Sequence, residues 1–179
     1  MNLYFRLFWL FAWRLRHISP IGFLDTSRMA YRVWPTDCDI NLHLTNARYP
    51  ALMDIGRTYM LAEMLQLKPL LKLKWLPVVN ASEFTFIKDI KPLQKFCLET
   101  RVLGWDDKYF YIEQRFVSER GLHAIANVRG LFVCKGRKIS SAELISQVGF
   151  SGAEPELPSS VAEWKTMLQR KKDENSHNS

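Results

Sequence analysis

Three long apolar segments separated by short turns constrain the fold of this chain most strongly. Residues 96–105, 109–118 and 122–134 are rich in β-branched and aromatic side chains, which is typical of strands. Turn-forming residues fill 104–108 and 119–121 between them. Strands joined by such short turns pair antiparallel, so the sequence predicts an antiparallel meander. Residues 76–87 and 31–34 have the composition of further strands.

A long helix is predicted before the meander, over residues 49–65. Pro50 suits its first turn, where a missing N–H breaks no hydrogen bond, and Thr45 or Asn46 is expected to cap it. One face of this helix is apolar or small, and it comprises Tyr49, Leu52, Met53, Gly56, Met60 and Met64. We therefore expect an α+β fold in which a curved antiparallel sheet wraps around a mostly buried helix.

The two ends of the chain are predicted to be additions to one central domain. Residues 1–16 join Trp, Phe and Leu with Arg6, Arg14 and Arg16, but their longest apolar run is shorter than the ~20 residues that span a bilayer. This composition fits a helix at a membrane surface, or one packed on the domain or a partner subunit. The expected division is an amphipathic segment and linker (1–26), a central domain (27–150) and a C-terminal linker, helix and polar tail (151–179).

The C-terminal part has recognisable helix signals. Residues 140–148 are predicted to form a short helix, and residues 151–158 a linker rich in Gly, Pro and Ser. Ser160 and Glu163 have the spacing of a capping box, which predicts a last helix running to about Lys171.

The net charge limits the candidate binding partners, and the cysteines indicate the cellular compartment. The formal net charge is +7, but no stripe of Lys and Arg is present, so an anionic membrane surface or a phosphate-bearing small molecule is favoured over nucleic acid. Cys38, Cys97 and Cys134 are odd in number and lack metal or redox spacing, which favours a reducing, cytoplasmic compartment. Cys38 has acidic neighbours, so we expect the pKa of its thiol to be raised and the thiol to be a poor nucleophile.

The loop TDCDINLHLTNARYP, residues 36–50, carries the most chemistry. A calcium loop is excluded, because Leu42 and Arg48 occupy the positions that need Gly and Glu. A metal site on Asp37, Asp39 and His43 would need a further ligand that the local sequence does not offer. The chain also has no phosphate-binding loop, dinucleotide fingerprint or G-x-S-x-G motif.

Two interpretations of the loop remain open from the residues alone. The aspartates can be turn-forming residues and His43 a hydrogen-bonded core histidine. Alternatively, Asp39 can face the unpaired N–H groups at the start of the helix, which stabilise a developing oxyanion. A carboxylate opposite such donors is the minimum equipment for hydrolysing an activated acyl group.

The loop resembles that of the 4-hydroxybenzoyl-CoA thioesterase-like family of hotdog-fold proteins. The similarity rests on Asp37-Cys38-Asp39 followed by His43-Leu44-Thr45-Asn46-Ala47-Arg48-Tyr49, and it extends over about residues 27–134. The segment VLGWDDKYFYIEQRFVS is similar to a membrane-associated branch of thioesterase-superfamily proteins.

The resemblance implies an acyl-CoA thioesterase of fatty acid metabolism, acting on CoA or acyl-carrier thioesters without metal or cofactor. Asp39 would be the nucleophile or general base, and the backbone N–H of Asn46 would polarise the carbonyl. His43 would shape the loop, and Thr45 and Tyr49 would contact substrate.

The resemblance further implies a homodimer or dimer of dimers with sites at the subunit interface, and a peripheral location at the inner face of a membrane. Leu42 stands where many members carry Gly, and Thr45 where many carry Asn. These departures motivate a second hypothesis, a non-catalytic acyl-binding or membrane-associated scaffold on the same fold.

Overall fold

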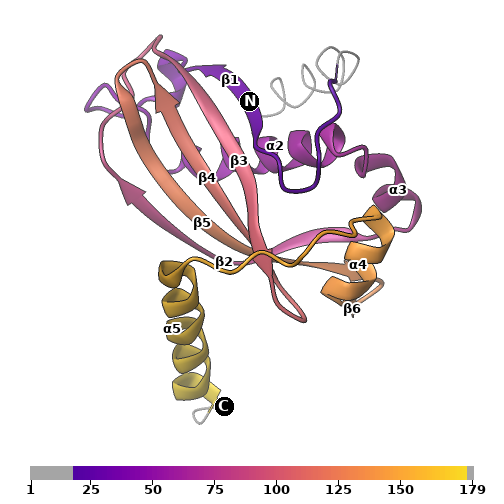
Figure 1. Cartoon of the computed structure of the whole chain (residues 1–179). Helices are drawn as coiled ribbons and strands as arrows, with labels where there is room; N and C mark the ends of the chain where they lie inside the picture. Colours follow the sequence, from indigo (N-terminus) through magenta and orange to yellow (C-terminus); the bar gives the residue numbers. More distant parts are fainter. Residues whose placement is uncertain (1–17, 177–179) are drawn as a thin grey trace.

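A curved antiparallel sheet wraps around one long helix, α2, Arg48–Glu63 (Figure 1). The computed structural model describes residues 18–176 of the chain. The expected α+β hotdog architecture is confirmed. Its strands are β1 Ser27–Arg32, β2 Leu76–Phe86, β3 Lys95–Trp105, β4 Phe110–Ser118, β5 Gly121–Cys134 and β6 Arg137–Ile139.

The order of strands across the sheet is β1-β3-β4-β5-β2, with β6 paired to the end of β5. All these pairings are antiparallel. β2 pairs with β5 from Leu76 opposite Val133 to Phe86 opposite Ala124. Within residues 18–176 no strand pairs with the other side of β2, so a strand of 11 residues forms one edge of the sheet.

The predicted meander is formed by β3, β4 and β5, and side-chain or glycine chemistry makes each turn. Between β3 and β4, Asp106 Oδ1 accepts the backbone N–H groups of Lys108 at 3.0 Å and Tyr109 at 2.8 Å. Between β4 and β5, Gly121 has φ 91°, a conformation that glycine adopts without steric cost. Both turns hold adjacent strands in the antiparallel register.

The apolar face of α2 packs into the concave side of the sheet. All six residues of the predicted face, from Tyr49 to Met64, are buried. Gly56 brings the helix close to β3, because a Cβ there would lie 2.6 Å from Leu98 Cδ2. A larger residue at this position would push the helix away from the sheet.

The short elements were not predicted from the sequence. These are η2 Pro35–Asp37, α3 Leu67–Lys72 and β6. The first strand, predicted at 31–34, begins four residues earlier and ends two residues earlier, at Ser27–Arg32. Leu65 after α2 and Lys74 after α3 have φ 59° and 56°, in the left-handed region where helices commonly end on glycine.

The C-terminal helices have different starts. α4, Ser141–Val148, is capped by Ser140, whose Oγ accepts the Glu143 N–H at 3.2 Å while Glu143 Oε2 accepts the Ser140 N–H at 3.0 Å. α5 spans Ser159–Ser176.

The predicted capping box at the start of α5 is wrong. Ser160 already lies inside the helix, and the carbonyl oxygen of Pro158 accepts the N–H groups of Val161 and Ala162. The helix also continues to Ser176, beyond the predicted end at Lys171.

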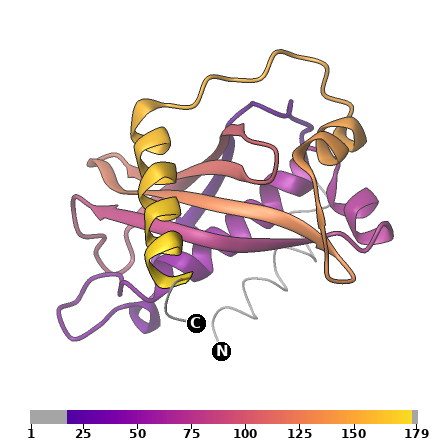
Figure 2. The same ribbon diagram turned by 90° about the horizontal axis from the view of Figure 1, so that it is seen from below.

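α5 lies across the strands on the face of the sheet opposite α2 (Figure 2). Val161 and Trp164 are buried there against Leu103 of β3 and Tyr111 of β4. The division of the chain at residues 27 and 150 stays a prediction, and residues 1–17, with the expected amphipathic segment, lie outside the described residues.

Candidate functional site

The loop between β1 and α2 folds back on itself, and backbone hydrogen bonds fix its path. The Asp39 N–H donates to the His43 carbonyl at 3.1 Å, and the Thr45 N–H donates to the Asp37 carbonyl at 3.0 Å. The Leu44 N–H donates to the Ile90 carbonyl at 2.8 Å, which ties the loop to the segment between β2 and β3. Asp39 and His43 therefore lie opposite each other on the two arms of the loop.

Asp37 has a structural position. It is 2% exposed, and its Oδ2 accepts the Trp34 N–H at 3.0 Å, while its Oδ1 lies 3.5 Å from Arg48 Nε. These contacts close η2 and connect it to the first residue of α2. A buried carboxylate with these partners holds the loop rather than meeting a substrate.

Asp39 is instead accessible. Its side chain is 30% exposed, Oδ1 accepts the Asn41 N–H at 2.9 Å, and the same oxygen lies 3.6 Å from His43 Nδ1. The Asn41 contact is the turn expected of a loop aspartate. Oδ2 has no hydrogen-bond partner among residues 18–176. His43 is 33% exposed, so it is not the core histidine that one interpretation of the sequence expected.

The start of α2 lacks the cap predicted at Thr45 or Asn46. The cap residue is Ala47, whose φ and ψ are already helical, and no side chain bonds the first turn. The reason is a preceding turn in which the Arg48 N–H donates to the Thr45 carbonyl at 2.9 Å, winding residues 45–48 directly into the helix. Asn46 is exposed, and its backbone N–H donates to no described residue.

Thr45, Tyr49 and Cys38 complete the loop residues. Thr45 is half-buried, and Tyr49 is 3% exposed, with its ring 5.0 Å from Phe86 and 4.7 Å from Phe116. Burial, and then the charge of Asp89, raise the pKa of Tyr49 to about 12.

The expectation for Cys38 is confirmed. Burial raises the pKa of its thiol, and Asp37 and Asp39 raise it further. The thiol therefore stays protonated at neutral pH and is a poor nucleophile.

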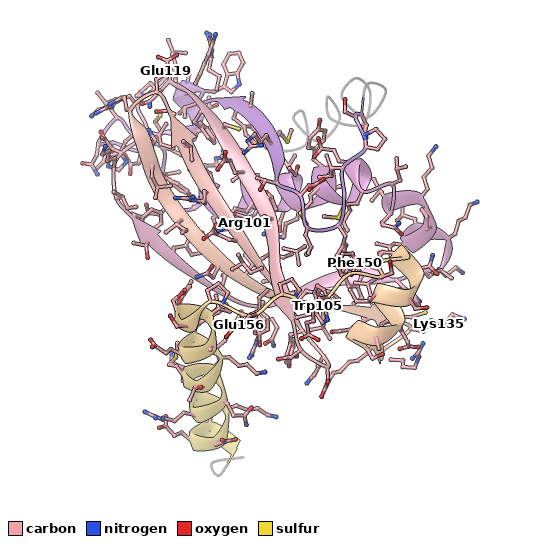
Figure 3. All side chains as sticks on the ribbon, in the orientation of Figure 1. Arg101, Trp105, Glu119, Lys135, Phe150 and Glu156 are labelled. Atoms are coloured by element: carbon pink, nitrogen blue, oxygen red, sulfur yellow. The ribbon has the colours of Figure 1, made fainter. Side chains whose placement is uncertain are left out.

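An apolar cavity of about 280 Å³ lies between the second half of α2 and the sheet. Polar groups enter its wall only at Asp54, Arg57, Thr58 and Gln66, and none of residues 36–49 lines it. Phe23 in the wall contacts the rings of Trp105 and Phe150, which Figure 3 labels. The apolar lining includes Met60, Met64, Leu70, Val102, Phe110 and Leu144.

The family model of the thioesterase-like superfamily matches residues 33–165, about three quarters of the chain. This chain belongs to that superfamily. The match includes the loop, α2, every residue that lines the cavity except Phe23, and the first seven residues of α5.

Individual relatives agree with this membership. A probable thioesterase of Saccharomyces cerevisiae is 37% identical over 89 residues, which cover 49% of this chain and 38% of the relative. Protein THEM6 of Danio rerio is 33% identical over 102 residues, covering 56% of this chain and 50% of the relative. The chain thus spans half or less of the length of these relatives.

Solved structures share the fold. A Staphylococcus aureus protein solved in complex with CoA superposes with a TM-score of 0.61 at 14% identity, covering 80% of this chain and 96% of that protein. At this identity the similarity shows the hotdog fold of this superfamily member and nothing finer. No helix within residues 18–176 is long and apolar enough to cross a membrane.

Sequence analysis missed a buried polar network beside the cavity. Gln114 on β4 is 0% exposed; its Nε2 donates to Thr100 Oγ1 at 3.0 Å and to the Met53 carbonyl at 3.1 Å, and its Oε1 accepts from Arg57 Nη1 at 2.6 Å. Arg57 also pairs with Asp54. Burial lowers the pKa of Arg57, with Asp54 acting in the opposite sense.

A buried histidine was also missed. His123 is 0% exposed, with Nδ1 2.9 Å from the Asp89 carbonyl and Nε2 2.6 Å from Ser118 Oγ. Ser118 Oγ also accepts from Gln94 Nε2 and from the Arg120 N–H. With its lone pairs occupied, this hydroxyl holds the sheet end together rather than attacking a substrate. No periodic pattern in the sequence distinguishes a buried histidine such as His123 from an accessible one such as His43.

Proposed function

We propose that the chain hydrolyses the thioester of an acyl-CoA or acyl-carrier substrate, with Asp39 at the reacting carbonyl. The observation that carries this proposal is the accessible Asp39–His43 pair on a loop that leads directly into an uncapped helix start. Superfamily membership and the names of the relatives support the reaction class. The fold neighbour with bound CoA supports the substrate class.

The chemistry follows from the two ends of this loop. The thioester oxygen would bind the free N–H of Asn46 at the positive end of the α2 dipole, which stabilises the negative charge of the tetrahedral intermediate. As a general base, Asp39 would take a proton from water while the water oxygen attacks the carbonyl carbon; the C–S bond then breaks and the thiolate takes up the proton. As a nucleophile, Asp39 would itself attack the carbonyl carbon; the C–S bond breaks, the thiolate leaves and takes up a proton, and water hydrolyses the resulting anhydride to release the acid and restore Asp39.

The remaining loop residues have supporting roles in this proposal. His43 would orient Asp39 through the contact to Oδ1, leaving Oδ2 for the reaction. Thr45 would set the path of the loop toward the acyl group. Tyr49, packed in the core, would fix the first turn of α2 against β2.

The apolar cavity is proposed to hold the acyl chain. Its volume of about 280 Å³ and its largely apolar wall suit a hydrocarbon chain rather than a polar group. Because the loop does not line the cavity of its own chain, we expect a second copy to complete the site.

Antiparallel pairing of two β2 edges provides this completion. β2 begins at the cavity, which Pro77, Val78 and Val79 line, and it ends at the start of α2, where Phe86 contacts Tyr49. Two such strands running in opposite directions place the loop of each copy beside the cavity of the other. The exposed apolar side chains of β2 and the residue after it fit this pairing: Leu76, Val78, Val79, Phe86 and Ile87.

The Asp39→Asn variant tests the proposal. We expect release of free thiol from short, long and aromatic acyl-CoAs to fall by roughly 10²–10³-fold, because the carboxylate that activates or attacks is lost. Asp107→Asn, an exposed aspartate in the β3–β4 turn, is the matched control and should keep full activity. Undiminished turnover in Asp39→Asn would refute the assignment of Asp39.

A scaffold that binds acyl groups without turnover is the second candidate. It is favoured by the bulky Leu42, which is 67% exposed on the loop. It predicts acyl-CoA binding by calorimetry with no thiol release in the wild-type chain, whereas Asp39-dependent release excludes it.

A further inference from the structure

The segment that links α2 to β2 presents leucines and lysines to solvent. Leu65, Leu71 and Leu73 are 60%, 58% and 39% exposed, and the lysines between and beside them are exposed too. We call this the α3 surface, and it comprises Leu65, Lys68, Leu71, Lys72, Leu73 and Lys74.

The charged residues of the α3 surface are all basic. No acidic residue occurs between Glu63 and Glu83, and none of its three lysines pairs with a carboxylate of residues 18–176. Lys135, in the turn after β5, lies at the same end of the molecule (Figure 3). The end of β5 contacts this segment directly, because Cys134 Sγ donates to the Leu73 carbonyl at 3.6 Å.

Four residues of the α3 surface line one groove: Leu65, Lys68, Lys72 and Leu73. Leu65 and Leu73 lie just before and just after α3, and Ile18 also lines the groove. Isolated exposed leucines need no explanation, but several leucines gathered in a groove with unpaired cations indicate a binding surface.

Backbone conformation adds a second, independent observation. Leu65 and Lys74 bracket α3 in the left-handed region, with φ 59° and 56°. Glycine ends helices there without steric cost, whereas leucine and lysine are strained.

We propose that the α3 surface docks on an anionic membrane surface. Leucines that enter the headgroup boundary and lysines that contact acidic headgroups are the combination that such a surface binds. A second copy of the chain fits less well, because it would bring two sets of unpaired lysines together. This inference does not depend on residues 1–16.

Docking would place the acyl cavity at the bilayer, a consequence that rests on the proposed function. Leu70, on the inner side of α3, and Gln66, just before it, line that cavity. A chain entering or leaving the cavity would then pass through the lipid boundary instead of water.

Sedimentation of the full chain with vesicles, in the absence of substrate, tests the docking separately from the activity. We expect binding to phosphatidylcholine vesicles that contain phosphatidylserine, and weaker binding to phosphatidylcholine alone. Combining Lys68→Glu, Lys72→Glu and Lys74→Glu should weaken binding roughly a hundredfold or more, from the usual contribution of a lysine near an anionic surface. The same charge change on α5, with Arg170→Glu, Lys171→Glu and Lys172→Glu, is the matched control and should leave binding within severalfold of wild type.

Leu65→Gly separates binding from folding. It should weaken vesicle binding while its thermal midpoint stays equal to or above that of the wild type, because the strained backbone is relieved. Vesicle binding unchanged by the α3 triple variant would overturn the proposal and assign any membrane contact to another part of the chain. An equal loss of vesicle binding in the α5 control would also overturn the proposal. So would a Leu71→Ser variant that binds vesicles as the wild type does but has a smaller mass in solution, because a second copy of the chain would then be the partner of this surface.

Discussion

Leu42 adopts a backbone conformation that glycine adopts most easily. Its φ is 56°, its side chain is 67% exposed, and its N–H donates to the Asp39 carbonyl at 3.1 Å. The resemblance places glycine at this position in many members of the family. The backbone at Leu42 therefore has the conformation that suits glycine although a leucine is present. The leucine does not change the course of the backbone at Asp39.

Replacing Leu42 by glycine is expected to stabilise the chain. Relief of the left-handed strain should raise the free energy of unfolding by about 0.5–1 kcal/mol, since an exposed side chain gives up little buried area. Urea denaturation measures this. Ile40→Gly is the matched control: Ile40 is 96% exposed without positive φ, so the added flexibility should leave stability equal or lower. Identical shifts in the two variants would argue against strain at Leu42.

The two aspartates show what the sequence could predict about the loop. Its composition identified Asp37 and Asp39 as candidates, and the resemblance selected Asp39. Burial separates them physically, and that burial depends on distant residues, such as Ile90, whose carbonyl fixes Leu44. The helix cap was mispredicted for a similar reason, because a turn at Thr45 is continuous with the helix and no side chain is needed there.

Among the elements, the β3–β4 turn and α5 are joined through one carboxylate. Asp106 Oδ2 accepts from Tyr111 Oη at 2.9 Å and pairs with Lys165 Nζ of α5 at 2.8 Å, while Oδ1 holds the turn. Burial acts to raise the pKa of Asp106, but the bonds from Lys165, the Lys108 and Tyr109 N–H groups and Tyr111 outweigh it, so the pKa lies below its ordinary value of 3.8.

This depressed pKa gives a pH-dependent prediction. A carboxyl whose pKa is lower in the folded state stabilises the fold above its unfolded-state pKa, and that stabilisation is lost as pH falls through the folded-state pKa. Asp106→Asn should therefore lower the free energy of unfolding by about 2 kcal/mol at neutral pH. The difference from wild type should shrink in acid denaturation below pH 3.8. A difference that is constant with pH, or equal in Asp107→Asn, would contradict this role.

Long periodic elements were predictable and short ones were not. α2 has six apolar or small residues at helical spacing, and these residues are buried in the structure. Strands β3 to β5 are separated by turns that the sequence identifies, and they pair as the meander predicts. In α3 the leucines of LKPLLK have helical spacing, but six residues are too few for a period to identify a helix, and Pro69 lies inside the segment. The start of α5 was misplaced because the helix already begins at Ser159, where the carbonyl oxygen of Pro158 accepts the Val161 and Ala162 N–H groups.

At the scale of the whole molecule, the edge strand β2 predicts assembly. We expect a dimer by light scattering, since 11 residues of unpaired edge with exposed apolar side chains favour strand addition. Val79→Lys places a charge on this edge and should yield monomers, whereas Leu93→Lys, on an exposed loop, should not. A wild-type chain that is monomeric at all concentrations would refute both the dimer and the shared site.

Mixing two inactive variants tests whether each site spans two copies. Asp39→Asn removes the carboxylate, and Thr58→Trp fills the cavity that Thr58 lines. If the loop of one copy serves the cavity of the other, half of randomly mixed dimers contain one intact site, which restores roughly a quarter of wild-type activity. No recovery on mixing would place loop and cavity in the same chain. Sequence alone could not predict this cavity, because its wall comes from three helices and four strands.

The cavity wall has two origins with different constraints. Strands β3, β4 and β5 supply residues such as Val102 and Phe110, whereas short peripheral helices supply Leu70 and Leu144. Remodelling those helices would lengthen or shorten the space without disturbing the sheet or the Asp39 loop. If the proposed function holds, a change in these helices would alter the preferred length of the acyl chain while the proposed site at Asp39 stays the same.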